Sequence, residues 1–408
     1  MYKRKLTDWL DGYLEYTDDD EPCELYRKWT AISTIASALQ RKCYHRFDRK
    51  TFYANFYLIL NGPSGARKST ALELMEELTE EVGIEIAADV TSKEKLLVRL
   101  KELGEEKEDT PVNRLLQMPQ SRQLGMPVEQ HSSLTAIADE LTVFFPENDQ
   151  DFVGYLIKLY DCKKHFKYET KTKGDTHIEN VWFNLIGGIT PDQLKRKFSQ
   201  EVVGTGLTGR MIIVSSLKNA RRNPLQYDTP KQKKIKIGLV NDLRSMLTLA
   251  GPFKADKGWE EAYVPWYKVI DRDFSFGNET LAPYETRRAS YIHKLSMISS
   301  ASRGSSMKLT EYDFGRAILI LEEVEKSMLE AIVGVGASHE GMILDDVNMF
   351  IQGVGEIEFS ALLERFMYQV RGKEELLGMV LALQEVGNVR VTQGKVSKKI
   401  NIKWSRND

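Results

Sequence analysis

Several kinds of protein are disfavoured by what this sequence lacks. It has only three cysteines in 408 residues, and Cys23, Cys43 and Cys162 form no C-x-x-C pair. Their wide spacing argues against a disulfide framework and a zinc ribbon, and it fits a reducing cytosol. No stretch approaches the roughly 18 apolar residues that a membrane span requires, and the charged N-terminus has no apolar signal-peptide core. We therefore expect a cytoplasmic protein that has no membrane partner.

The chain also lacks an excess of positive charge, because 57 Lys and Arg residues are balanced by 59 Asp and Glu residues. Any nucleic-acid surface must therefore be a local patch. The apolar content of 42% and the charged content of 28% are typical of a globular protein. Since 408 residues are too many for one ordinary core, the sequence predicts several regions: a helical region at 1–50, an α/β core at 51–220, a helical lid at 221–333 and a small domain at 342–408.

The segment GPSGARKST, from Gly62 to Thr70, follows an apolar run and precedes an amphipathic stretch. A strand, a glycine-containing loop and a helix form the context of a phosphate-binding loop. Backbone N–H groups and the helix N-terminus there offer positive charge to a polyphosphate. Arg67 departs from the pattern G-x-x-x-x-G-K-[ST], because it stands in place of the second glycine. The predicted nucleotide-binding residues are Gly62, Pro63, Ser64, Gly65, Ala66, Arg67, Lys68, Ser69 and Thr70.

A carboxylate pair, Asp139-Glu140, follows a second predicted strand at 133–138. At the end of a strand in a P-loop nucleotidase, the first acid holds magnesium and the second polarises the attacking water. The Ser69 hydroxyl is placed to reach the same ion, and Lys68 supplies a charge for the outer phosphates. We therefore predict ATP and Mg²⁺ as cofactors, with Ser69 and Asp139 as metal ligands.

A third predicted strand at 181–186 ends in Gly-Gly-Ile-Thr-Pro, and Thr190 is then placed to sense the γ-phosphate. Asn184 is the weaker candidate because it lies in the middle of the strand. Arg210 closes the glycine-rich loop GTGLTGR before a fourth predicted strand. A lone arginine there is usually solvated or structural, but the order of motifs favours an arginine finger that enters a neighbouring subunit. The predicted catalytic residues are Lys68, Glu140, Thr190 and Arg210.

Three basic segments have alternative interpretations. The stretch Arg41–Lys50 is interpreted as a solvated face beside the nucleotide fold. A predicted hairpin near residue 174 either tracks a nucleic-acid backbone or uses its lysines only to keep an edge soluble. In the lid, Arg287, Arg288 or Lys294 could reach a phosphate, although a surface salt bridge is the commoner fate of such residues. The predicted DNA-binding lysines of the hairpin are Lys163, Lys164, Lys167, Lys171 and Lys173.

After a glycine-rich linker at 334–341, the sequence predicts two helices followed by a two-stranded hairpin. This is the outline of a winged-helix module, whose helix and wing often contact DNA. Such modules also bind proteins, so DNA and a protein are both candidate partners of this module.

The ordered motifs resemble the AAA+ ATPases of replicative helicase type. The segment LTGRMIIV, from Leu207 to Val214, is similar to the arginine-finger segment of the minichromosome maintenance helicases. The hairpin before the third strand resembles the DNA-contacting hairpin of superfamily 3 viral helicases. More closely, residues 10–325 resemble an uncharacterised P-loop family of phages and mobile elements that is often associated with primases. The shared segments are GPSGARKS, Asp139-Glu140-Leu141, IGGITP, GLTGR and Ala88-Asp89-Val90-Thr91.

This resemblance implies a P-loop NTPase core of the AAA+/ASCE class, with N-terminal helices, a helical lid and a winged-helix-like module. It also implies an ATP-dependent DNA helicase or translocase that acts in replication as a homo-oligomeric ring, with a hexamer expected. Its partners would be single-stranded or forked DNA and other replication proteins such as a primase. A second interpretation is an ATP-controlled binding or assembly module, such as a helicase loader or a phage-defence switch, that unwinds nothing.

Overall fold

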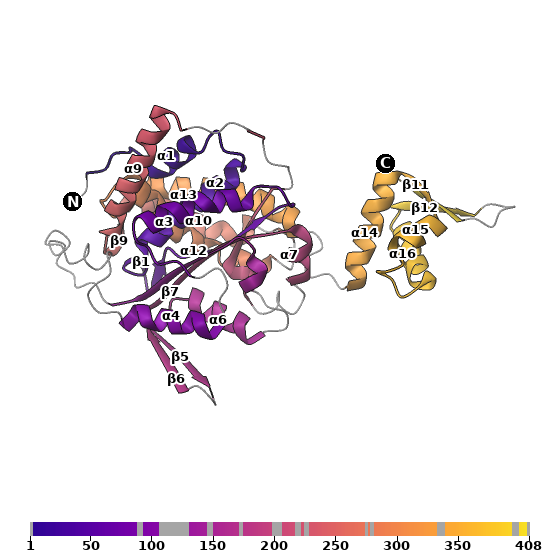
Figure 1. Cartoon of the computed structure of the whole chain (residues 1–408), viewed down its shortest axis with the longest axis horizontal. Coiled ribbons are helices and arrows are strands. Elements are labelled where there is room, and N and C mark those ends of the chain that lie inside the picture. The colour runs from indigo at the N-terminus through magenta and orange to yellow at the C-terminus, as the bar shows by residue number, and fades with distance from the viewer. Residues whose placement is uncertain are drawn as a thin grey trace. The chain divides into compact units, whose positions relative to one another are not determined.

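The computed structural model describes residues 3–87, 93–105, 130–144, 150–170, 174–197, 206–216, 222–223, 228–273, 276–277, 281–332, 339–393 and 400–405. It is a mixed α/β protein with parallel sheets and many helices (Figure 1). Its contacts divide it into two compact units, Met1–Val333 and Gly334–Asp408. Within the described ranges, no helix has the length and apolar character needed to cross a bilayer.

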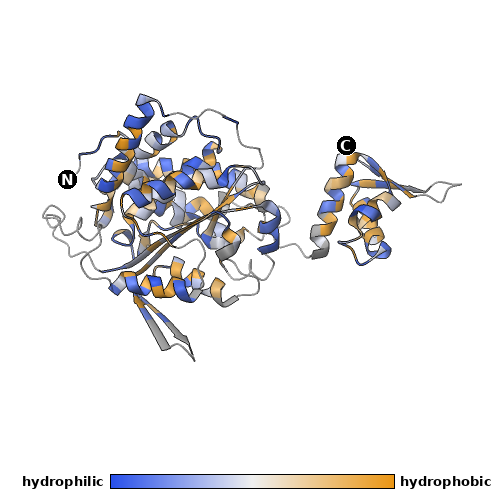
Figure 2. Ribbon diagram, in the orientation of Figure 1, coloured by the Kyte–Doolittle hydropathy of each residue, from blue (hydrophilic) through white to orange (hydrophobic). Residues whose placement is uncertain are grey.

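The core of the first unit is a four-stranded sheet in which every neighbouring pair is parallel. All residues of its strands are buried, as expected for a parallel sheet that is covered on both faces. Figure 2 shows these strands as predominantly hydrophobic. In spatial order the strands are β4 (Ser132–Ala138), β7 (Val181–Ile189), β3 (Tyr57–Asn61) and β8 (Met211–Ser215).

Helices cover both faces of this sheet. On one side lie α2 (Glu24–Leu39) and α3 (Lys68–Glu81), and on the other lie α4 (Lys93–Glu105) and α6 (Gln150–Tyr160) (Figure 1). Before α4, Ile86 forms a parallel bridge with Thr135 of β4. Residues 88–92 lie outside the described ranges, so the Ala88–Thr91 motif has no structural account here.

The N-terminal region is not helical throughout. After α1 (Trp9–Tyr16) and α2, the chain forms an antiparallel hairpin of β1 (Cys43–Phe47) and β2 (Lys50–Tyr53). The interpretation of this basic stretch as a solvated face is wrong for part of it, because Lys42 and His45 are buried. Burial lowers the pKa of Lys42 to about 8. Along β1, buried residues alternate with more exposed ones, which is the period-2 pattern of a half-buried strand. This part of the region predicted to be helical is therefore a strand.

The region 221–333 is not purely helical either, because two of its segments extend this hairpin into a second sheet. The order of that sheet is β10 (Lys308–Leu309), β9 (Gly251–Ala255), β1 and β2. The helices of this region are α9 (Pro230–Leu247), α10 (Lys257–Asp273), α11 (Ala282–Glu285), α12 (Arg288–Arg303) and α13 (Glu311–Ile332).

The predicted basic hairpin is present as β5 (His165–Thr170) and β6 (Gly174–Glu179), which form a two-stranded antiparallel sheet. It extends from the body of the first unit (Figure 1). Its base is held because Phe166 is buried and packs edge-to-face on Tyr155 of α6.

The second unit has its own core, formed by residues such as Val347, Leu362, Leu376 and Ile402. Its three strands pair antiparallel in the order β11–β13–β12. A third strand, Glu356–Glu358, adds to the predicted hairpin, and α14 begins inside the linker expected at 334–341. The elements are α14 (His339–Val354), β11 (Glu356–Glu358), α15 (Phe359–Phe366), α16 (Lys373–Glu385), β12 (Val389–Gln393) and β13 (Ile400–Trp404).

Candidate functional site

The predicted phosphate loop joins the carboxyl end of β3 to the amino end of α3, as its sequence context requires. The Lys68 ammonium donates to the carbonyl oxygens of Gly62 at 2.7 Å and Pro63 at 3.1 Å. Burial lowers the pKa of Lys68, while the Glu140 carboxylate opposes this effect. The lysine thus folds back over its own loop, where an incoming anion could replace two weaker carbonyl acceptors.

The carboxylate pair lies beside this loop. Asp139 and Glu140 follow β4, which is separated from β3 only by β7. Gly188 of β7 stands between them and the lysine: a Cβ at this position would come within 2.7 Å of the Asp139 carbonyl oxygen and 3.4 Å of Lys68 Cβ and Cε. Position 188 therefore needs glycine to allow this close approach. The Thr142 hydroxyl donates to Glu140 at 3.2 Å and orients its carboxylate.

Thr190 ends β7 at the same edge of the sheet, and it caps α7 (Pro191–Lys197). Its hydroxyl donates to Gln193 Oε1 at 2.7 Å and accepts from the Gln193 N–H at 3.4 Å, while Gln193 also accepts the Thr190 N–H. This is a capping box, and Thr-x-x-Gln is its sequence signature. The structural role is independent of any role toward a nucleotide, and the sequence contained a signal for it.

Asn184 has a structural role, in agreement with its lower ranking as a sensor. It is fully buried, accepts the Phe56 N–H at 2.8 Å and donates to Ser33 at 2.9 Å. These bonds fasten α2 to two strands of the central sheet. Tyr26 of α2 adds a further bond to the carbonyl of Asn61, the last residue of β3. The carboxyl end of β3 is therefore rigidly supported beneath the loop.

Arg210 lies immediately before β8, at the edge of the sheet where the parallel strands begin. The phosphate loop lies at the other edge, where the strands end. The Arg210 guanidinium donates to both oxygens of Asp161, at 3.0 and 2.8 Å, and to the Gly206 carbonyl at 2.9 Å. The Arg210 side chain is only 9% exposed. In this conformation Arg210 is an internal ion-pair partner and does not project toward another subunit. Its partner Asp161 carried no recognisable signal in the sequence.

We expect Arg210→Ala to destabilise the protein by about 1–3 kcal/mol, because the Asp161 carboxylate and the Gly206 carbonyl lose their donor. Asp161→Asn should lower the unfolding temperature in the same direction. Thermal unfolding of both variants without nucleotide checks this expectation. Unchanged stability of both variants would show that the internal ion pair is unimportant for the fold.

Two lid cations considered for phosphate contact are unsuitable in this fold. Arg288 is buried and forms a bidentate ion pair with Glu325. Lys294 is also buried, donates to the Asn55 carbonyl at 2.6 Å, and lies 4.0 Å from the Tyr160 ring centroid. Burial lowers its pKa to about 7. Arg287 alone of these three residues is partly exposed.

Three of the predicted hairpin lysines, Lys163, Lys164 and Lys167, are exposed, whereas the side chains of Lys171 and Lys173 lie outside the described residues. In the hairpin register, Lys167 faces His177 and His165 faces Glu179, with a 2.8 Å contact between the last two side chains. The exposed surface of the hairpin base is thus basic but not uniformly so.

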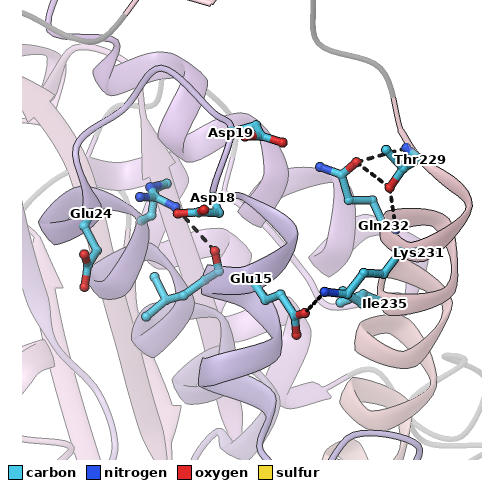
Figure 3. Close-up of a pocket in the computed structure, with 10 residues that line it drawn as sticks. Glu15, Asp18, Asp19, Glu24, Thr229, Lys231, Gln232 and Ile235 are labelled. Atoms are coloured by element: carbon cyan, nitrogen blue, oxygen red, sulfur yellow. Dashed lines mark hydrogen bonds and ion pairs between the residues drawn. The ribbon is translucent and has the colours of Figure 1, made fainter.

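Two hollows flank the acidic turn Asp18–Glu21. One, of about 440 Å³, is lined by residues such as Glu15, Asp18 and Lys231 (Figure 3). Figure 3 shows the Lys231 ammonium pointing toward the Glu15 carboxylate, to which it forms an ion pair. The second hollow, of about 760 Å³, is lined by Tyr16, Asp19, Thr70 and Gln232 among others. Since Thr70 belongs to the predicted phosphate loop, the second hollow adjoins that loop.

Sequence reasoning missed one contact at the loop itself, an ion pair between Arg67 and Glu21. Glu21 lies 46 residues before Arg67, so no local sequence pattern links the two side chains. In the described part of the chain, no group of three or more His, Cys, Asp or Glu side chains could hold a metal ion by itself. Magnesium commonly needs only one or two carboxylates in addition to substrate phosphates. Asp139 and Ser69 are oxygen donors of the type that fits this ion.

No known protein family has a model that matches the chain. A comparison with curated proteins also finds no match. Function must therefore be argued from the arrangement of side chains.

Proposed function

We propose that the protein is an ATP-driven DNA translocase or helicase of a phage or mobile element that works as a ring of identical subunits. The observation that supports this most is the common location of Lys68, Asp139–Glu140 and Thr190. These residues come from three separate segments but meet where β3, β4 and β7 end. The order of the strands, with β7 between β3 and β4, supports assignment of the unit to the AAA+/ASCE class of P-loop ATPases.

The chemistry follows from these positions. The loop N–H groups and the amino end of α3 attract the phosphates, and Lys68 exchanges its carbonyl partners for phosphate oxygens. Mg²⁺, when bound through Asp139 and Ser69, neutralises phosphate charge. Glu140 accepts a proton from the attacking water, and Thr190 hydrogen-bonds the γ-phosphate. The hollow beside Thr70, at about 760 Å³, has room for the nucleoside.

The proposed ring depends on the distance of Arg210 from the phosphate loop of its own subunit. β8 pairs with β3 so that Met211 lies opposite Tyr57 and Ser215 opposite Asn61. Arg210 precedes Met211, so it is separated from Gly62, the first residue of the phosphate loop, by six residue steps, or about 20 Å along the sheet. A catalytic role for Arg210 consequently requires the site of an adjacent subunit, and its guanidinium must exchange Asp161 for phosphate. We expect a hexamer.

DNA contact is proposed for the lysines at the base of the hairpin and for the second unit. Helices and a three-stranded antiparallel sheet support the assignment of the second unit as a winged-helix-like module. A primase and other replication proteins are proposed partners, in keeping with the family resemblance.

One observation favours a second function, an ATP-controlled assembly module such as a helicase loader or phage-defence switch. The outward stripe of α16 presents Glu374, Gly378, Leu381 and Glu385, all exposed. Two carboxylates on this face oppose contact with DNA phosphates, whereas Leu381 suits a protein partner. Under this alternative the protein would hydrolyse ATP and assemble without separating strands.

Hydrolysis and unwinding assays test the proposal. We expect single-stranded DNA to stimulate ATP hydrolysis by the full chain about tenfold, because ordering of the ring brings each Arg210 to a neighbouring site. The same protein should displace a strand from a forked duplex. Hydrolysis without strand displacement would support the assembly module, and the absence of nucleotide binding would refute both functions. Native mass measurement with a non-hydrolysable ATP analogue would report the ring size.

A further inference from the structure

Arg67 occupies a backbone position that favours glycine. Its φ of 59° and ψ of 38° lie in the left-handed region, which residues with a side chain seldom adopt. It immediately precedes the first residue of α3 and makes no side-chain cap to that helix. The turn itself therefore gives no reason for an arginine, and the reason must lie in the contacts of the side chain.

The side chain is held by the acidic turn. Arg67 Nε pairs with Glu21 Oε2, and the other oxygen of Glu21 accepts the Asn223 N–H at 3.2 Å. The Asn223 amide also donates to the Asp19 carbonyl at 3.0 Å, which anchors the turn. Glu21 is only 16% exposed, whereas Arg67 is 50% exposed. The carboxylate is thus the fixed member of the pair.

Among the described residues, only the Nε side of the Arg67 guanidinium has a polar partner. Within the described part of the chain, the pair with Glu21 is the single polar contact of the Arg67 side chain, and it involves Nε. The terminal Nη1 and Nη2 groups have no partner there. An arginine fork presents two parallel N–H groups that match phosphate oxygens, whereas lysine acts as a point charge.

We propose that Arg67 is a second phosphate-binding cation of the nucleotide site and that Glu21 positions it. Glu21 holds Nε and leaves both terminal amino groups to donate to a nucleoside di- or triphosphate. This inference rests on the proposed function, because it assumes that the loop binds phosphate. It gives a role to the one residue that departs from the G-x-x-x-x-G-K-[ST] pattern, and it makes the acidic turn part of the nucleotide site.

The decisive variant is Arg67→Gly, because glycine accepts the left-handed backbone and restores the motif. Titration calorimetry of the full chain with ATPγS and ADP, each with Mg²⁺, measures the affinity. We expect binding to weaken about tenfold, the loss of one charge-assisted phosphate contact. Arg67→Lys keeps the charge without the fork and should give an intermediate loss. The unfolding temperature without nucleotide checks that Arg67→Gly folds.

Glu21→Gln tests positioning, since it removes the charge of the ion pair with Nε while keeping the size of the side chain. We expect a smaller loss of about threefold because the neutral amide no longer attracts the Arg67 guanidinium. Glu15→Gln is the matched control. Glu15 lies on the neighbouring helix α1 and pairs with Lys231, so this variant removes the same charge without touching Arg67, and its affinity should match wild type.

The outcomes separate the two proposals. Wild-type affinity in Arg67→Gly would overturn the role of Arg67 while leaving the nucleotide site intact. Tighter binding by Arg67→Gly would also overturn it, because the side chain would then obstruct the site. Failure of the wild-type protein to bind either nucleotide would refute the proposed function itself.

Discussion

Lys68→Ala is expected to reduce ATP hydrolysis by about 100-fold or more, the loss typical of removing a preorganised group that stabilises developing charge. In the structure the Lys68 ammonium already lies over the loop, 2.7 Å from the Gly62 carbonyl. It also lies close enough to Glu140 for the two charges to interact. Its removal should weaken nucleotide binding as well as hydrolysis. Steady-state phosphate release with saturating single-stranded DNA measures the effect.

Two comparison variants make this result specific. Glu140→Gln should lose hydrolysis about 100-fold through loss of the general base, yet retain nucleotide binding because its side chain accepts the proton of water and holds no phosphate. Lys257→Ala removes a lysine that is 87% exposed and paired with Glu261 on the same helix, so hydrolysis should match wild type. Undiminished hydrolysis by Lys68→Ala would show that the loop is not the nucleotide site.

The central sheet was largely predictable from the sequence. Its strands are short apolar runs bounded by glycine or charged residues, and this signal is local. The predicted strand at 133–138 is observed as Ser132–Ala138, and the predicted strand at 181–186 continues to Ile189. The extension includes Gly187 and Gly188, which lower strand propensity but are required by close packing against Ala138 and Asp139.

The second sheet was not predictable, because its strands come from distant parts of the chain. β1 pairs with β9 through contacts such as His45 with Phe253. Each strand is short and carries polar residues, so it has no apolar run of its own. What holds them is tertiary packing, for example the stacking of Phe52 on His293 of α12 with ring centroids 4.0 Å apart. Tertiary contacts of this kind override local propensity.

The candidate site likewise has features that the sequence predicts and features that it does not. Residue types and spacing selected Lys68, Asp139, Glu140 and Thr190, because each lies in the loop or turn that follows an apolar run, and these segments adjoin one edge of the sheet in the structure. Residue types and spacing were not sufficient to find the partners Glu21 and Asp161, which are far from Arg67 and Arg210 in sequence. An ion pair between distant segments leaves no periodic signal. The burial of Arg210 was therefore unforeseeable, although its place before a strand was correctly recognised.

The largest expected effect on stability is that of Arg288→Ala. Arg288 of α12 donates from Nε to Glu325 Oε1 of α13 at 2.7 Å and from Nη2 to Oε2 at 3.0 Å. Both side chains are 4% exposed. Removing one partner of a buried pair leaves an uncompensated charge and costs about 3–5 kcal/mol. Chemical denaturation of the full chain measures the loss in the first unit's transition.

A control pair that uses another carboxylate of α13, Glu323, separates burial from charge. Lys28 pairs with Glu323 at 2.7 Å, but its partner is 43% exposed. Lys28→Ala should therefore cost only about 0–1 kcal/mol, the range for solvent-exposed pairs. Equal losses in Lys28→Ala and Arg288→Ala would contradict the assignment of the large effect to burial.

The pH dependence of Arg288→Ala gives a second, independent test. Burial already raises the pKa of Glu325, and Arg288 and the Tyr284 hydroxyl oppose this rise. Without Arg288 the folded-state pKa rises further above its unfolded value, so the folded state binds more protons in the window between the two values. Stability of the variant must then fall as pH rises through that window, and the deficit relative to wild type should be smaller at acidic than at neutral pH.

The double variant Arg288→Met/Glu325→Leu removes both charges and should recover most of the loss, because well-packed apolar residues often replace a buried ion pair without cost. A deficit that is independent of pH, or that persists in the double variant, would mean that lost packing and not the stranded Glu325 carboxylate is the cause.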